Sequence, residues 1–241
     1  MHINNFYTYS RYKSIYCTHD REPFFEVALK YARAIGKERP VIADIGSGEG
    51  DLYNYIKAQH FPTDNIYLLD SNVKTVESNK AALTANAILY TAPERLPFED
   101  GSVDLVHTSH LIEYLSPAGI YPLMVEMDRV LADGGYLVIS APLFWNDFYN
   151  DLGHVRPYNP RVFHKYFIEM YRNNRLQKIS DDYEMVDLVY RYHQFPLDEG
   201  WSSSAPWLDS VIISLKRILG KLSIKKMYKN GYTLVLRKRR K

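Results

Sequence analysis

The sequence predicts an α/β protein in which helices cover both faces of a mostly parallel sheet. Short runs rich in Val, Ile and Leu occupy residues 41–45, 65–69, 103–106 and 135–139, and a weaker run spans 87–90. Such runs are typical of strands that are buried on both faces. Segments of helical periodicity lie between them, and this alternation implies parallel strands joined by helical crossovers.

The expected helices carry recognisable start and stop signals. One helix is expected over residues 21–34, where apolar side chains form a single stripe. Ser116-Pro117 supplies an N-cap and a first helical residue for a helix over 117–131, and the glycines at 134–135 are expected to stop it. Asn159-Pro160 opens another helix in the same way.

The composition is that of a folded globular protein. The chain has 241 residues, of which 46% are hydrophobic and 24% charged, and this length suits one α/β domain. Cys17 is the only cysteine, so no internal disulfide can form and a reducing compartment is expected. The first residues lack the pattern of a signal peptide, and no run of about 18 apolar residues occurs. We therefore expect a cytoplasmic location.

The charge is distributed unevenly along the chain. The formal net charge is only +2, yet residues 216–241 hold many Lys and Arg and no Asp or Glu. The part before them is therefore acidic. A basic end of this kind suggests an anionic partner without saying which one.

A glycine-rich turn marks the expected ligand site. Gly46, Gly48 and Gly50 directly follow the run at 41–45, and a helical segment follows them. Glycines let the backbone turn tightly and approach a ligand at the carboxyl ends of the strands. The spacing differs from Gly-x-Gly-x-x-Gly, the pattern of dinucleotide-binding folds, and no Gly-Lys-Ser/Thr of a P-loop follows.

The acidic residues around this turn indicate the kind of ligand. Asp44 precedes the first glycine and Glu49 lies within the turn. Carboxylates here would repel a pyrophosphate but would suit a ligand that carries an ammonium and a sulfonium, such as S-adenosylmethionine (SAM). Asp70 follows the run at 65–69, where an acidic residue can accept hydrogen bonds from ribose hydroxyls; the alternative is that it only starts a turn.

Several ordered blocks resemble the class I SAM-dependent methyltransferases of the methyltransferase type 11 kind. Residues 43–50 read ADIGSGEG, 69–70 read LD, and 93–115 read PERLPFEDGSVDLVHTSHLIEYL. Residues 127–142 resemble the helix and strand that follow in that family. The resemblance implies a Rossmann-like sheet of seven strands with an antiparallel last strand, for which residues 231–237 fit.

The resemblance also implies a set of cofactor-binding residues. The residues around the methionine end would be Asp44, Gly46, Ser47 and Gly48. Asp70 would bind the ribose, with Ser71 beside it, and Pro93 and Glu94 would lie along the adenine. The floor near the methyl group would be lined by Thr108, Ser109 and His110. Two positions depart from the family: Ala92 replaces a frequent Asp, and Tyr114 replaces a frequent His. The first departure weakens a side-chain contact to adenine.

The segment 143–160 is the expected acceptor-binding loop, because it combines aromatic and charged side chains. His154 is the candidate general base, with Asp147 and Asp151 as weaker candidates. The acceptor would meet Trp145, Arg156 and Tyr158, together with His110. The alternative is that His154 and Arg156 tie the loop to the next helix and that the two aspartates are turn residues. No compact spacing predicts a metal site.

Residues 154–160, HVRPYNP, also resemble a stretch of type 11 enzymes encoded with surface-glycan pathways. The resulting prediction is SAM-dependent O-methylation of a sugar in a surface polysaccharide or lipid-linked glycan. The alternatives are methylation of a small metabolite such as a quinone or polyketide, methylation of RNA, and a SAM-fold protein that only binds. Nucleic acid is the less expected partner because the chain has no recognisable RNA-binding module.

The two ends are expected to complete a single domain. Residues 1–36 would form an N-terminal cap in which Tyr12 meets the acceptor, or an ordinary packed extension; 37–142 would be the SAM-binding core, 143–230 the acceptor loop with a basic amphipathic insertion, and 231–241 the closing strand with a basic tail. An amphipathic helix that begins at Ser204 could lie on the inner face of an anionic membrane. We favour the alternative that its apolar face packs on the domain or on a second subunit in a homodimer.

Overall fold

The structure is a computed structural model that describes residues 22–83, 86–145, 147–168, 178–196, 208, 210–215 and 225–240. Its seven-stranded sheet has the order β3-β2-β1-β4-β5-β7-β6. The strands are β1 (Ile42–Ile45), β2 (Ile66–Asp70), β3 (Asn86–Leu89), β4 (Val103–Ser109), β5 (Leu131–Pro142), β6 (Tyr183–Pro196) and β7 (Lys225–Lys238). The first five pair in parallel, whereas β7 runs antiparallel to both β5 and β6. The predicted fold class is confirmed.

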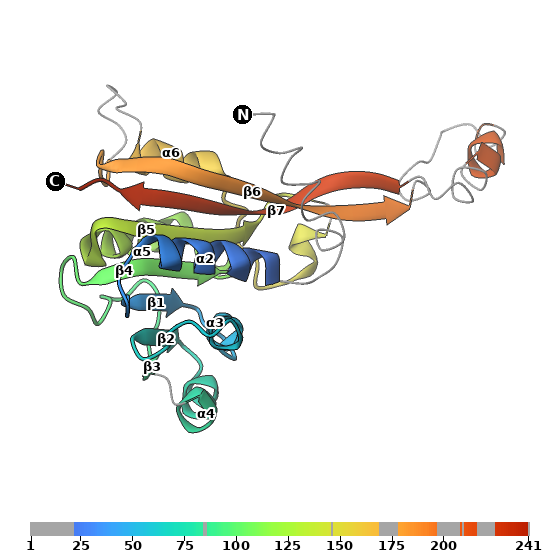
Figure 1. Ribbon diagram of the computed structural model, residues 1–241. Coiled ribbons are helices and arrows are strands. Elements are labelled where there is room, and N and C mark those ends of the chain that lie inside the picture. Colours follow the sequence, from blue (N-terminus) through green and yellow to red (C-terminus); the bar gives the residue numbers. More distant parts are fainter. Residues whose placement is uncertain are drawn as a thin grey trace.

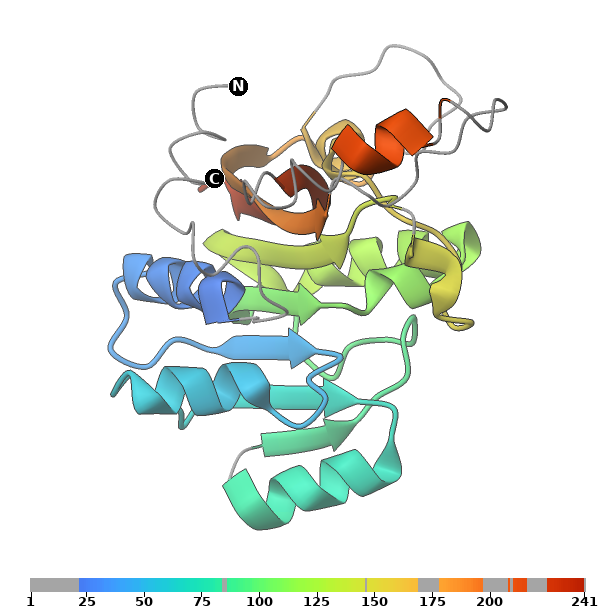
Figure 2. The ribbon, with the colours of Figure 1, turned by 90° about the vertical axis from the view of Figure 1, so that its right-hand side faces the viewer.

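Helices cover both faces of this sheet (Figures 1 and 2). They are α2 (Glu22–Ala34), α3 (Asp51–Ala58), α4 (Val73–Leu83), α5 (Pro117–Val130) and α6 (Pro160–Phe167). The first three bury apolar side chains in one core cluster, and α5 and α6 contribute to the cluster on the opposite face. In this three-layer arrangement the carboxyl ends of the parallel strands lie at one edge of the sheet, where loops can build a ligand site.

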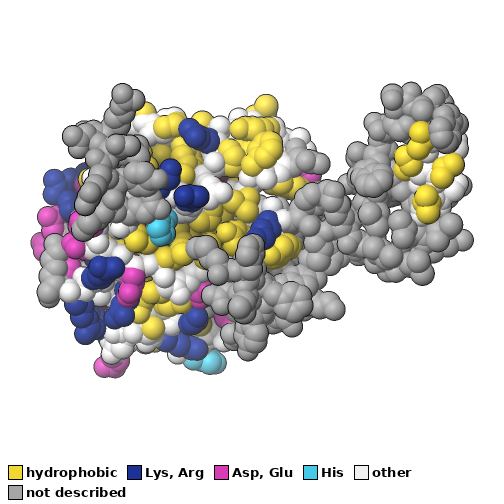
Figure 3. All heavy atoms as spheres, turned by 90° about the horizontal axis from the view of Figure 1, so that it is seen from above, with side chains coloured by type: hydrophobic (Ala, Val, Ile, Leu, Met, Phe, Trp, Pro, Cys, Tyr) yellow, Lys and Arg dark blue, Asp and Glu magenta, His cyan; other side chains and the backbone are white. Residues whose placement is uncertain are grey.

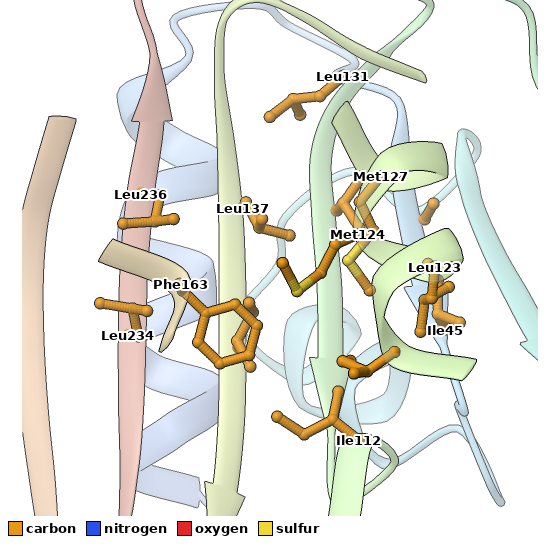
Figure 4. Close-up of a cluster of buried hydrophobic side chains, with 14 of the residues drawn as sticks. Ile45, Ile112, Leu123, Met124, Met127, Leu131, Leu137, Phe163, Leu234 and Leu236 are labelled. Atoms are coloured by element: carbon orange, nitrogen blue, oxygen red, sulfur yellow. The ribbon is translucent and has the colours of Figure 1, made fainter. Parts of the chain in front are cut away.

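The core under α5 shows how the apolar stripe of a helix is used. Met124, Met127 and Leu123 are buried against strand residues that include Ile45 and Leu137. Figure 4 shows Met124 of α5 and Phe163 of α6 beside Leu137 of β5. Burial of each such side chain contributes about 1.5–3 kcal/mol, so this packing fixes the position of the loops that follow β1 and β4.

The end of α5 differs from the expectation. The helix ends at Val130 and β5 begins at Leu131, so the glycines at 134–135 lie inside the strand rather than stopping the helix. Gly134 has a φ of +83°, and a Cβ on Gly135 would come within 2.8 Å of the Asp104 carbonyl oxygen. The pairing of β4 with β5 shifts register in the same region. The two glycines therefore allow β5 to begin irregularly and to approach the backbone of β4 closely.

The strands β6 and β7 form a long hairpin that extends past the rest of the sheet (Figure 1). Pairing of β5 with β7 ends at Pro142 and Gly231, whereas β6 and β7 remain paired to Pro196 and Lys225. The expected strand at 231–237 is thus the inner half of a longer one.

Part of the expected amphipathic helix is described beyond this hairpin. Leu208 and residues 210–215 are helical, and the apolar side chains there are visible at the far end of the hairpin in Figure 3. Val211 and Leu215 are 52% and 53% exposed, so these side chains do not pack on the domain within the single chain. Residues 204–206 and 216–222 lie outside the described residues.

Among the described residues, no helix has the length and apolar character needed to cross a membrane. In the same residues, no group of three or more His, Cys, Asp or Glu side chains is placed to hold a metal ion.

Candidate active site

The glycine turn joins β1 to α3 at the carboxyl edge of the sheet. Three glycines of this turn have φ angles in a region that other residues rarely adopt. The angles are +74° at Gly46, +52° at Gly48 and +77° at Gly50. The backbone N–H groups of Gly46 and Ser47 both donate to the Leu69 carbonyl, at 2.8 and 3.0 Å. The turn is therefore hydrogen-bonded to the end of β2, the strand whose last residue is Asp70.

Asp70 connects the turn to the loop after β2. One carboxylate oxygen accepts a hydrogen bond from the Gly48 N–H at 2.9 Å, and the other accepts from the Asn72 N–H at 2.9 Å. A carboxylate offers about four lone-pair sites, so both oxygens can accept further hydrogen bonds from ribose hydroxyls. Ser71 is exposed beside it. Asp70 thus lies directly beside the turn, and its ribose role stays a prediction.

Asp44 lies beneath the turn rather than on its surface. Its side chain is 4% exposed, and one carboxylate oxygen is 2.6 Å from Nδ1 of His107, whose side chain is 1% exposed. The two residues are register partners on β1 and β4. His107 was not predicted as a site residue, although a histidine inside a buried strand is itself a usable signal. Asp44 is therefore held inside the sheet by His107, two residues before the turn begins.

Three buried hydroxyls line the same edge. Ser47 Oγ, Thr108 Oγ1 and Ser109 Oγ have no hydrogen-bond partner within the part of the chain that the structure describes. Buried polar groups are nearly always satisfied, so hydroxyls of this kind fit a polar ligand. Together with the glycine turn and Asp70 they supply donors and acceptors suited to the amino-acid end and ribose of SAM. The residues present therefore fit the cofactor that the sequence predicts.

The expected adenine edge follows β3. The peptide bond between Ala92 and Pro93 is cis, and Glu94 is exposed. The Glu94 carbonyl accepts a hydrogen bond from the Tyr90 hydroxyl at 2.8 Å. Burial, followed by the nearby carboxylates of Glu126 and Glu94, raises the pKa of Tyr90, which keeps its hydroxyl a neutral donor.

Arg129 of α5 holds the loop that follows the expected adenine-binding residues. Its guanidinium donates to the carbonyls of Leu96 and Phe98 at 3.0 and 2.8 Å and forms a two-point ion pair with Glu126. The hydrogen bonds from Arg129 lower the pKa of Glu126. One side chain thus ties the loop between β3 and β4 to the helix.

We expect Arg129→Lys to lower the free energy of unfolding by about 2–3 kcal/mol. The ammonium group of lysine cannot form the paired hydrogen bonds that the planar guanidinium makes with Glu126. Urea denaturation measures the loss. The matched change Arg39→Lys, at an exposed pair 3.8 Å from Asp64, should cost no more than about 0.5 kcal/mol. Because the pKa of Glu126 is lowered on folding, its contribution is complete above the ordinary pKa of glutamate and is lost as the pH falls through the lowered value. An Arg129→Lys effect that stays constant through acid pH would contradict this explanation.

The acceptor loop brings His154 and Asp151 together but leaves Asp147 apart. His154 Nδ1 is 2.6 Å from the Phe148 carbonyl oxygen, and Nε2 is 3.8 Å from an Asp151 carboxylate oxygen. The imidazole packs against the rings of Phe148 and Tyr114, at centroid distances of 4.7 and 5.0 Å. Hydrogen bonds from the Gly153 N–H and the Tyr114 hydroxyl lower the pKa of Asp151.

The remaining predicted residues of the loop take different positions. Asp147 is exposed and accepts from the Asn150 amide at 3.1 Å, as a turn residue does. Tyr158 is 4% exposed, and its hydroxyl donates to the Leu115 carbonyl at 2.8 Å, so it anchors the loop. Arg156 is exposed with its guanidinium 5.9 Å from the Tyr158 ring centroid. Trp145 is half-buried, and Tyr12 lies outside the described residues.

A further polar cluster follows β4. His110 has a φ of +55° and lies 3.0 Å, through Nδ1, from a carboxylate oxygen of the fully buried Glu113. Nε2 of the same ring is 3.3 Å from a guanidinium nitrogen of Arg191 on β6. The Glu113 carbonyl accepts the backbone N–H groups of Val155 and Arg156 from the acceptor loop. Of these residues only His110 was predicted at the site, because Arg191 comes from a strand that was not assigned from the sequence.

The middle of the chain is similar to known methyltransferases. Residues 43–139 match the methyltransferase domain family. A malonyl-[acyl-carrier protein] O-methyltransferase of Marinomonas sp. is 35% identical over 104 residues, which are 42% of this chain and 37% of that protein. An uncharacterized methyltransferase of Synechocystis is 30% identical over 110 residues, which are 43% of this chain and 50% of its own length. The matches thus span half or less of these relatives.

Solved structures share the fold over nearly the whole chain. A SAM-dependent methyltransferase from Archaeoglobus fulgidus has a TM-score of 0.58 at 19% identity and covers 97% of this chain and 99% of its own. A geranyl diphosphate methyltransferase in complex with SAM has a TM-score of 0.53 at 15% identity, with 89% and 84% coverage. The chain therefore has the Rossmann-like methyltransferase fold, and SAM is the cofactor that the comparisons support.

Proposed function

We propose that this protein is a SAM-dependent methyltransferase that methylates an oxygen atom of a glycan acceptor. The observation that carries the cofactor half of the proposal is the glycine turn held by Asp70 at the carboxyl ends of β1 and β2. The methyltransferase domain match covers this turn and continues through β4 into β5. It therefore includes the strands whose loops approach the methyl group in the proposed arrangement.

The chain's own groups have two tasks in this reaction. When bound, SAM supplies an activated methyl group on a sulfonium. Gly46, Ser47 and Asp70 would hold the cofactor, and the pair of Asp44 and His107 lies in the neighbouring strands β1 and β4 that lead into the site. The acceptor loop would orient the attacking oxygen in line with the methyl group, since alignment supplies much of the rate enhancement in a displacement.

The acceptor loop supports a sugar as the acceptor. Phe144 and Tyr149 are 69% and 57% exposed, and their rings lie 6.1 Å apart. Exposed aromatic rings in the same loop as Asp147 and Asp151 offer stacking surfaces and hydrogen-bond acceptors for a pyranose. The rest of the glycan assignment depends on the resemblance of residues 154–160 to enzymes of surface-glycan pathways.

A small apolar acceptor is the second candidate. Leu152 and Val155, in the same loop, are 102% and 48% exposed, and the apolar body of Phe144 lies nearby in the chain. These side chains would suit a quinone or polyketide. The Marinomonas relative, whose name specifies a malonyl-[acyl-carrier protein], adds a carboxylate oxygen to the acceptors that merit testing.

The test is a SAM-consumption assay with the full chain over panels of glycans, quinones, malonyl-carrier protein and RNA, with mass spectrometry of each product. We expect a mass gain of one methyl group on a glycan hydroxyl. Methylation of a quinone or of the carrier-bound malonyl group alone would replace the glycan assignment. An absence of SAM binding in calorimetry would remove the methyltransferase proposal itself.

His154 gives a more specific expectation. Its ring packs against Phe148 and Tyr114, and its Nδ1 lies within hydrogen-bond distance of the Phe148 carbonyl. We therefore propose that it fixes the conformation of the loop that binds the acceptor. His154→Ala should raise the acceptor KM by about tenfold through lost packing and orientation, with SAM affinity unchanged. Steady-state kinetics on the acceptor found in the panel, with calorimetry for SAM, separates the two. An unchanged KM with a large fall in kcat would show instead that His154 acts on the reacting proton.

A further inference from the structure

We propose that Asn79 of α4 is a positioning residue for the cofactor turn, because its side-chain amide holds the Gly48 carbonyl and so prepares the turn to receive SAM. This inference rests on the proposed function, and it adds a residue that lies outside the turn, 31 positions after Gly48. It is carried by the hydrogen bonds of Gly48, by the open space around this glycine and by the burial of Asn79.

Both backbone polar groups of Gly48 are held by side chains from outside the turn. The Gly48 N–H donates to a carboxylate oxygen of Asp70 at 2.9 Å, and the Gly48 carbonyl accepts from the side-chain amide of Asn79, also at 2.9 Å. A carbonyl oxygen can only accept, so the NH2 end of the Asn79 amide must face it. Each of the two peptide planes that meet at the Cα of Gly48 is therefore held by one side chain.

Close packing does not restrain Gly48 on the side where a side chain would lie. A Cβ on Gly48 would meet nothing within 4 Å, and φ at this residue is +52°. Glycine can adopt both signs of φ, so the two hydrogen bonds to side chains are what restrict rotation about the Gly48 backbone bonds. Without Asn79 one peptide plane would lose its restraint, and SAM binding would have to order the turn at a loss of affinity.

Packing of α4 alone does not account for an asparagine at this position. The buried residues of α4 are Val76 and Asn79, and Asn79 is 3% exposed. Burial of an amide is unfavourable unless it forms hydrogen bonds, and asparagine is a weaker helix former than alanine or leucine. An apolar side chain would therefore suit the packing of α4 better. The hydrogen bond to Gly48 offsets both disadvantages.

The helix that carries Asn79 is itself held against the start of α3. The Tyr53 hydroxyl of α3 donates to the Leu83 carbonyl at the end of α4, at 2.8 Å. A Cβ on Gly50, the residue before α3, would lie 2.5 Å from a Cδ atom of Leu83 and 3.7 Å from Oδ1 of Asn79. The end of the turn and α4 thus approach each other closely. Asn79 therefore reaches Gly48 from a helix whose position relative to the turn is fixed.

The first test needs no ligand. Nuclear magnetic resonance of the full chain labelled with ¹⁵N-glycine measures amide hydrogen exchange at Gly48, whose signal is the one lost in Gly48→Ala. Asn79→Leu and Asn79→Ala should each raise this exchange rate by about fivefold or more, because a freer carbonyl plane loosens the neighbouring N–H bond to Asp70. Exchange at Gly101, whose N–H donates to the Arg129 carbonyl, should stay unchanged. An unchanged rate at Gly48, or an equal rise at both glycines, would overturn the proposal.

The second test is calorimetry with SAM, followed by kinetics on the acceptor found in the panel. Both Asn79 variants should weaken SAM binding by about tenfold, with kcat at saturating SAM within about twofold of wild type, because Asn79 acts on the turn and not on the reacting atoms. Asn86→Ala is the matched variant, since its exposed amide donates to the Asp64 carbonyl at 3.1 Å, and it should leave SAM affinity unchanged. Wild-type SAM affinity in both Asn79 variants would overturn the proposal. An absence of SAM binding by the wild-type chain would instead be a failure of the proposed function.

Discussion

Asp70→Ala is expected to lower the affinity for SAM by about 100-fold or more, since it removes a charged acceptor of several hydrogen bonds worth about 1.5–3 kcal/mol each. The carboxylate holds the Gly48 N–H at 2.9 Å, so its loss both frees the turn and deletes the acceptor proposed for the ribose. Calorimetry with SAM measures the effect directly. Turnover at subsaturating SAM should fall in parallel.

Asp64→Ala is the matched variant for this change. Asp64 precedes the same strand and is 65% exposed, and its salt-bridge partner, Arg39, is 3.8 Å away. Its loss should leave the SAM dissociation constant within about twofold, because an exposed pair contributes at most about 1 kcal/mol to stability and does not touch the turn. Equal losses in both variants would show that the Asp70 effect is general destabilisation.

Gly46→Ala is expected to lower the free energy of unfolding by roughly 2–4 kcal/mol and to weaken SAM binding by at least about tenfold. The backbone there has a φ of +74°, and the new Cβ would lie 3.1 Å from the Cβ and 3.3 Å from the Cδ atoms of Leu111. Relief of this contact must move either the turn or the loop after β4, and both are parts of the proposed site. Urea denaturation and calorimetry report the two effects separately.

Gly36→Ala separates strain from contact. Gly36 has nearly the same φ, +77°, but a Cβ there would meet nothing within 4 Å. It should therefore cost only the backbone term, about 1–2 kcal/mol, with SAM affinity unchanged. If Gly46→Ala costs no more than Gly36→Ala, the proposed close packing of the turn against Leu111 is not important.

The architecture followed from local patterns that survive tertiary packing. The buried strand runs, the cap at Asn159-Pro160 and the glycine turn each depend on neighbours within a few residues. The Asn159 side chain accepts from the Arg161 N–H, as an N-cap does, and α6 begins at Pro160. The glycines at 134–135 were assigned to a helix end because the same residue type serves irregular strand starts, which depend on the neighbouring strand β4.

The site was only partly predictable for a related reason. Gly46, Gly48 and Asp70 were predicted because their spacing along the chain is itself the signal. His107 and Arg191 were not, since their roles depend on register across the sheet: His107 is level with Asp44 on the neighbouring strand, and Arg191 reaches His110 from β6. Pairings between residues far apart in sequence leave no local pattern.

The same limit applies to the acceptor loop. Its sequence could not separate Asp151, which lies beside His154, from Asp147, which closes a turn with Asn150. It also could not show that Tyr158 points inwards to the Leu115 carbonyl. Aromatic and acidic residues in one loop predict an acceptor surface, and contacts across the fold decide which of their side chains stay exposed.

The central claim, that the turn between β1 and α3 binds SAM, is tested most directly by isothermal titration calorimetry of the full chain. Titrations with SAM, S-adenosylhomocysteine and NAD distinguish a SAM site from a dinucleotide site. We expect SAM and S-adenosylhomocysteine to bind at one site per chain, NAD to give no binding, and Asp70→Ala to weaken the binding of both SAM and S-adenosylhomocysteine. Binding of NAD in preference to SAM, or SAM binding that is unaffected by Asp70→Ala, would contradict the proposed site.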